Sequence, residues 1–134
     1  MVIDSNGNVG IGIIYPGALA YKLSVNGKIG AREIIVTSDT WADYVFKKDY
    51  NLKPLNEVEK FIKSNKHLEG IPTEKEVKTN GIAVGDMQAK LLQKVEELTL
   101  YVINQDKKID NLTQENALLK NTVIKLADKN NTIE

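Results

Sequence analysis

Apolar residues recur at alternating steps of four and three residues along the last third of the chain. The a positions of this heptad repeat are Val95, Val102, Ile109, Asn116, Val123 and Asn130, and the d positions are Leu91, Leu98, Gln105, Leu112, Leu119, Leu126 and Ile133. This period is typical of a helix that supercoils around a partner helix. A lone helix would leave these side chains in water, so we expect a second copy of the chain to cover them. The a and d residues from Leu91 to Leu126 are called the seam below.

The polar residues of the seam bear on strand direction and strand number. β-branched residues at a with Leu at d favour a parallel dimer, and Asn116 at a reinforces that choice. Gln105 at a d position weakens the inference. In a parallel coil each of these two residues meets its own copy, so every buried polar group has a partner. Parallel alignment is therefore predicted. The seam by itself does not decide between a dimer and a trimer. A seam that tolerates its polar residues without any specificity is a further alternative.

The first zone of the chain, residues 1–37, shows a strand pattern. Apolar residues alternate with glycine over 9–13, and Asn-Gly dipeptides stand at 6–7 and 26–27. Asn-Gly between apolar residues predicts β-hairpins with type I′ turns, because both residues tolerate positive φ. Glycine at alternate strand positions suits close approach of another backbone, as in strands packed around a shared axis. An ordinary small hairpin with loop glycines is the alternative.

The middle zone, residues 38–85, contains an aromatic cluster and two capping signals. Four aromatic residues fall within ten positions and are expected to form a packed core: Trp41, Tyr44, Phe46 and Tyr50. A first helix is predicted from Asn56, whose side chain forms a capping box with Glu59. It ends within 65–70.

A second short helix begins at a Thr73–Glu76 capping box and stops before Gly81, which suits a left-handed cap. Asp86 can then cap the long helix. The sequence predicts an α+β fold in three parts: a β-structured segment over 1–37, a small mixed helical and strand core over 38–85, and a coiled-coil helix over 86–134.

Composition narrows the function classes. Lys and Arg number 18, as do Asp and Glu, so the net charge of zero argues against a nucleic-acid binder, which needs a basic surface. The absence of cysteine excludes disulfides and Cys-based metal sites. No apolar run approaches the roughly 20 residues needed to cross a membrane, and no secretory signal is visible. We expect either a protein that stays in the cytoplasm until it is released or the C-terminal piece of a longer chain.

Other chemistry finds little support in the sequence. Asp4, Asn6 and Asn8 resemble the start of a calcium loop, but Val9 stands where glycine is needed and Tyr15 where the glutamate should be. A hairpin turn is expected there instead. His67 is the sole histidine and has no second histidine with which to share a metal. No cofactor, metal or enzyme activity is predicted.

Two sets of segments resemble a known family. Residues 4–12 (DSNGNVGIG), 15–18 (YPGA) and 22–29 (KLSVNGKI) resemble a strand motif of fibre-like proteins from Bacteroidetes and their phages. Residues 41–46 (WADYVF), 55–62 (LNEVEKFI), 67–72 (HLEGIP) and 85–92 (GDMQAKLL) are similar to the C-terminal module of those proteins. That module resembles the endosialidase-type intramolecular chaperone domain that ends many phage tail fibres and tailspikes.

The resemblance implies a parallel homotrimer that brings a fibre into register, in a virion tail or an extracellular phage-like particle made in the bacterial cytoplasm. Some relatives cut themselves off at a serine with a lysine a few residues later. Ser38 resembles that serine, but Asp43 stands where the lysine is expected, so autoproteolysis is not predicted. Two rival functions stay open: an autoproteolytic chaperone that cleaves before Ser38, and a fibre tip that binds a host surface receptor through Trp41 or Tyr44.

Overall fold

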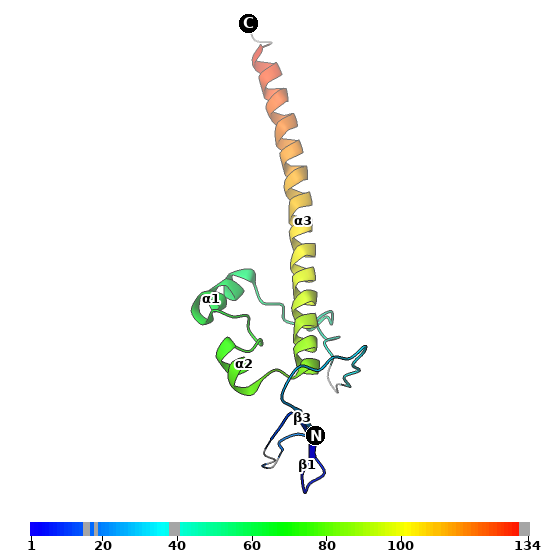
Figure 1. Cartoon of the computed structure of the whole chain (residues 1–134). Coiled ribbons are helices and arrows are strands. Elements are labelled where there is room, and N and C mark those ends of the chain that lie inside the picture. Colours follow the sequence, from blue (N-terminus) through cyan, green and yellow to red (C-terminus); the bar gives the residue numbers. More distant parts are fainter. Residues whose placement is uncertain (15–16, 18, 38–40, 132–134) are drawn as a thin grey trace. The chain divides into compact units, whose positions relative to one another are not determined.

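The computed structural model describes residues 1–14, 17, 19–37 and 41–131. The backbone divides into two compact units, Met1–Ile35 and Val36–Glu134. The first holds three short strands and the second holds three helices, of which the last is long (Figure 1). This confirms the predicted α+β class.

The first unit is a small mixed sheet with strand order β1-β2-β3. β1 (Val2–Ile3) pairs antiparallel with β2 (Val9–Ile11), with Val2 opposite Gly10. β2 pairs parallel with β3 (Leu23–Val25). The parallel pair was not predicted; a hairpin cannot join two parallel strands, because the connection must return the chain to the same end of the sheet.

The two Asn-Gly sites behave differently. The first joins β1 to β2, as predicted, but only its glycine has positive φ (Gly7, 71°), so the turn is not type I′. The Gly7 amide donates to the Asp4 carbonyl oxygen at 3.0 Å to close the turn. The second site follows β3, and no strand follows it within residues 28–37. The predicted second hairpin is therefore wrong.

The strand glycines serve contacts within the chain. A Cβ atom on Gly10 would lie 3.0 Å from Val2 Cγ2, so the small residue makes room for a neighbouring side chain. Gly12 has φ of 71°, and a Cβ there would lie 3.0 Å from the Asn26 carbonyl oxygen. The close backbone approach expected from the glycine pattern thus occurs between two segments of one chain.

Tight turns over 41–50 in the second unit rest on small residues. Ala42 and Val45, three residues apart, are buried, whereas Trp41 and Phe46 are each 59% exposed. The predicted aromatic core is therefore wrong. Residues three positions apart in a turn project to the same side. In this segment the buried side carries Ala42 and Val45 rather than the aromatic residues.

Two short helices follow, and their starts show how local signals compete. α1 spans Leu55–Asn65 with Pro54 as its N-cap and has no side-chain cap hydrogen bond, so the Asn56–Glu59 box is not formed. α2 spans Glu74–Asn80, and its Thr73–Glu76 capping box is present as predicted.

The two short helices end differently. α1 ends within the predicted range, and Lys66 after it takes a left-handed conformation. α2 stops before Gly81 as predicted, but Gly81 combines φ of 71° with ψ of −167°, so the predicted left-handed cap is not formed. Neither helix contains a fully buried residue. Their apolar side chains are therefore only partly covered by the rest of the chain.

α3 spans Val84–Asn131, and its 48 residues extend about 70 Å at 1.5 Å per residue. It begins before Asp86, which lies in the first turn rather than at the cap. An acidic residue there still favours the helix, because the first turn carries the positive end of the helix dipole.

Candidate interaction surface on helix α3

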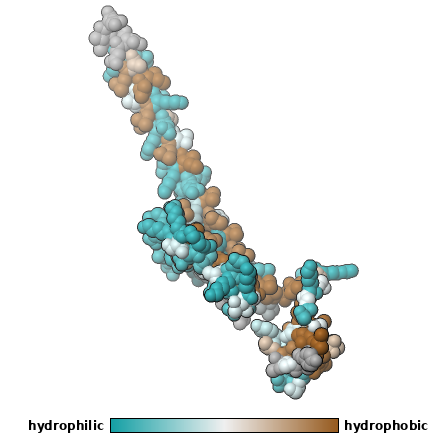
Figure 2. Space-filling view, turned by 60° about the vertical axis from the view of Figure 1, so that its left-hand side comes forward, coloured by the Kyte–Doolittle hydropathy of each residue, from teal (hydrophilic) through white to brown (hydrophobic). Residues whose placement is uncertain are grey.

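The seam lies exposed along α3. Its nine apolar side chains are each between 50% and 64% exposed: Leu91, Val95, Leu98, Val102, Ile109, Leu112, Leu119, Val123 and Leu126. Figure 2 shows hydrophobic side chains recurring along this helix. An exposed apolar stripe of this length is typical of a surface that another molecule covers. α3 forms a coiled coil only when at least one further helix packs against the seam.

The opposite face of the first turns of α3 is covered by the chain itself. Glu96 is buried, and Gln93 and Leu100 are half-buried. At 100° per residue these three positions lie about half a turn around the helix from Leu91 and Leu98. Intrachain packing therefore uses one face of α3 and leaves the seam free.

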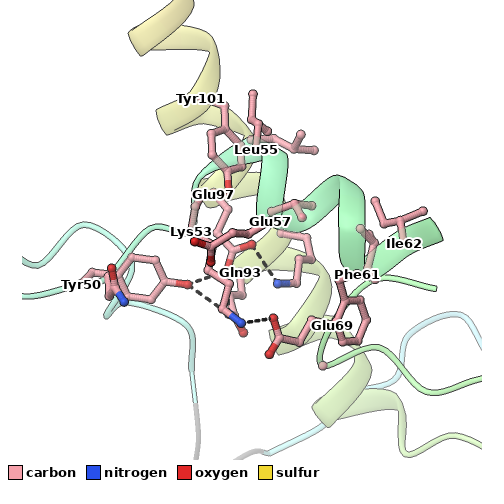
Figure 3. Close-up of a pocket in the computed structure, with 16 residues that line it drawn as sticks. Tyr50, Lys53, Leu55, Glu57, Phe61, Ile62, Glu69, Gln93, Glu97 and Tyr101 are labelled. Atoms are coloured by element: carbon pink, nitrogen blue, oxygen red, sulfur yellow. Dashed lines mark hydrogen bonds and ion pairs between the residues drawn. The ribbon is translucent and has the colours of Figure 1, made fainter. Parts of the chain in front are cut away.

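A hydrogen-bond network ties the turns over 41–50 to this covered face, and Figure 3 shows the part around Tyr50. The Tyr44 hydroxyl donates to Gln93 Oε1 at 2.8 Å, and the Tyr50 hydroxyl donates to Glu97 Oε1 at 2.5 Å. Gln93 Nε2 and Lys94 Nζ each donate to Glu97 at 2.8 Å. Two of the four clustered aromatics thus anchor the segment through their hydroxyl groups rather than through a shared apolar core.

The network shifts the acidity of its members. Burial, aided by the hydrogen bond to Glu97, raises the pKa of Tyr50 to about 12. Burial of Glu97 by itself would raise its pKa, but hydrogen bonds from Lys94, Tyr50 and Gln93 outweigh it and leave the pKa below the usual value. The two shifts widen, at both ends, the pH range over which a neutral phenol faces a carboxylate.

A cleft of about 590 Å³ separates α1 from α3. Among the described residues, no Cα atom of α1 comes within 8 Å of a Cα atom of α3. The apolar side chains that line the cleft are Leu55, Val58, Phe61, Ile62, Leu68 and Leu98. The Tyr101 hydroxyl donates to the Lys53 carbonyl oxygen at 2.6 Å and links the two sides (Figure 3). Sequence reasoning missed this cleft, although the apolar face of α1 was visible in the pattern.

Hydrogen bonds to the Asp4 carboxylate hold its turn. Asp4 Oδ1 accepts the amides of Asn6 and Asn8 at 2.8 and 2.9 Å. Asp4 Oδ2 accepts Asn8 Nδ2 and the Leu19 amide at 3.1 and 3.2 Å. The hydrogen bonds from Asn8, Asn6 and Leu19 also hold the pKa of Asp4 below its usual range. The hairpin turn predicted here is therefore confirmed.

Ser38 and His67 are the remaining residues that the sequence raised as candidates. Ser38 lies outside the described residues. The His67 ring lies edge-on to Phe61. Within the described ranges no cluster of three potential metal ligands occurs, and no helix there has the length and apolarity to cross a membrane.

Gln105 and Asn116, the two polar residues of the seam, are exposed beside their apolar neighbours. The surface is therefore continuous from Leu91 to Leu126, with two polar positions in it. It offers apolar contact and amide hydrogen bonds. Comparison with known proteins adds no relative: no protein-family model, no curated protein and no solved structure matches this chain.

Proposed function

We propose that the chain is a structural assembly module that forms a parallel homotrimer through α3 and brings a fibre-type protein into register. In this proposal it is the C-terminal intramolecular chaperone of a tail fibre, in a virion or phage-like particle. The observation that carries it is the exposed seam, left free on one face of α3 while the chain covers the opposite face.

Association would be driven by burial of the seam. A fully buried Val, Leu or Ile side chain contributes about 1.5–3 kcal/mol relative to an exposed one, and the seam offers nine of them. Gln105 and Asn116 then penalise slipped registers, because a shifted helix would place an amide against an apolar side chain. Once α3 is paired, the upstream segments of the chains are held at high effective concentration.

Residues 28–37 also favour association upstream of the helices. They lie outside any strand and expose Ile29, Ile34 and Ile35 to solvent at 64%, 68% and 83%. Further copies of the chain would cover these side chains in a wound shaft. The glycines at 10 and 12 serve intrachain contacts and do not argue for three strands, so the choice of a trimer over a dimer rests on the family resemblance.

Two adjacent leucines of α3 provide the test. Leu119 belongs to the seam and is 62% exposed, and its neighbour Leu118 lies outside the seam and is 68% exposed. Leu119→Ser should weaken the oligomer by about 2 kcal/mol per chain, the cost of truncating a buried leucine, whereas Leu118→Ser should leave it unchanged. Sedimentation equilibrium at micromolar concentration measures both. A wild-type chain that sediments as a monomer would refute the proposal.

A second candidate function is receptor binding at a fibre tip, and the exposure of the aromatics favours it. Trp41 is 59% exposed beside a shallow hollow that Tyr44, Asp86 and Lys90 also line. Aromatic rings next to charged groups suit a glycan. Because Trp41 is the sole tryptophan, fluorescence quenching by a glycan panel reports on this site directly, and a lack of quenching by every glycan would argue against it.

Autoproteolysis before Ser38 is the third reading, and it is not expected because Asp43 replaces the lysine of the cleaving relatives. The intact mass of the expressed chain would reveal such cleavage.

A further inference from the structure

The cleft between α1 and α3 is an apolar space that the single chain leaves unfilled. Leu55 on α1 is 47% exposed and Leu98 on α3 is 60% exposed, and both line it. An apolar space of about 590 Å³ next to exposed leucines is favourable only when another apolar group occupies it.

The position of the cleft on the heptad points to a helix. Leu98 is a d residue of the seam, and the other α3 residues that line the cleft are Lys94 and Tyr101 at g, Glu97 at c and Gln93 at f. The cleft therefore opens beside the seam, on the g flank of α3. In a parallel coil the g flank of one helix faces the e flank of its neighbour.

An exposed apolar residue, Ile103, lies beside the e flank of α3 and is not part of the seam. Ile103 is a b residue next to Thr99 at e, and its side chain is 44% exposed. It follows Tyr101 by two residues, so it projects about 200° around the helix from the cleft of its own chain. In an in-register pair it lies about 3 Å further along the axis than the partner's Tyr101.

We infer that the cleft is a socket for a second copy of the chain, into which Ile103 of the partner subunit inserts between α1 and α3. The inference rests on the proposed parallel assembly and adds a contact to it. α1 then packs on the outside of the neighbouring α3, which covers its apolar side chains. The arrangement also explains how a helix that stands off its own α3 is held in place.

Cysteine crosslinking tests the socket, because the natural chain has no cysteine. Tyr101 bonds the Lys53 carbonyl oxygen, two residues before Leu55, and both Tyr101 and Leu55 line the cleft, so Leu55→Cys reports on that end. This variant is mixed with Ile103→Cys, refolded from denaturant and treated with a short bis-maleimide. Lys107→Cys replaces Ile103→Cys in the control, since it lies one turn further at the f position, which faces away from a partner helix.

The expected product is an interchain Leu55–Ile103 crosslink, identified by peptide mass, that forms several-fold more than the Leu55–Lys107 product. Sedimentation of each variant is measured in parallel. An intact oligomer with equal crosslinking in both mixtures would overturn the socket and leave the proposed function standing. A monomeric wild-type chain would overturn both.

Amide exchange gives a second measurement without cysteine. Ile103→Ser should speed exchange in α1 several-fold while the oligomer persists, and Lys107→Ser should not. Unchanged α1 exchange in an intact Ile103→Ser oligomer would also contradict the socket.

Discussion

At the scale of single residues, short-range hydrogen bonds follow the sequence where no stronger constraint competes. The Thr73–Glu76 box forms because both partners lie within one turn of a helix start. Asn56 fails as a cap because the helix already begins at Leu55, with Pro54 at the N-cap two positions before Asn56. Asp4 stabilises its turn because its carboxylate accepts four hydrogen bonds, one of them from the Leu19 amide. Only the fold brings that last donor close.

The hydroxyl of Tyr50 is expected to stabilise the second unit. Tyr50→Phe removes the hydrogen bond to Glu97 and should lower the free energy of unfolding by about 1–2 kcal/mol, measured by urea denaturation at pH 8. Tyr21→Phe is the control, because Tyr21 is 71% exposed.

The same variant predicts a pH dependence. The pKa of Tyr50 is raised from 10.0 to about 12 in the folded chain, so its contribution is fully present below pH 10 and is lost as pH rises from 10 to 12. The stability difference between wild type and Tyr50→Phe should therefore shrink between pH 9 and pH 11.5. A constant difference over that range would show that Tyr50 is not the group involved.

At the scale of elements, the sequence predicted the position of α3 and its seam, but not the packing of residues 41–50 against its other face. Periodicity alone located the helix and the seam, because a repeat of 3.5 residues survives any local exception. The covered face carries Gln93, Glu96 and Glu97, which resemble ordinary solvent-facing positions in a sequence. Gln93 and Glu97 are held there by hydrogen bonds from tyrosines more than forty residues away.

Asn116 tests the polar register of the seam. Asn116→Ile should raise the stability of the oligomer by about 2 kcal/mol per chain, because a buried amide is replaced by an apolar group, and should broaden the distribution of oligomer sizes. Thermal unfolding and light scattering measure the two effects. Unchanged stability would place Asn116 outside the buried seam.

At the scale of the whole molecule, the described residues bury little apolar surface. Their fully buried hydrophobic side chains are Ala42 and Val45, while most large ones stay exposed. A chain of 134 residues that leaves its apolar groups in water is marginal alone. The proposed assembly would supply the missing burial through the seam, the cleft and residues 28–37.

The sequence by itself determined the α+β class, the long helix, the exposed heptad seam and the local turns at Asp4 and Thr73, because each depends on residues close together along the chain. The tertiary structure decided the parallel β2–β3 pair, the exposure of Trp41, the tyrosine contacts to α3 and the cleft beside Leu98. These features depend on contacts between segments far apart in sequence, which no local pattern encodes.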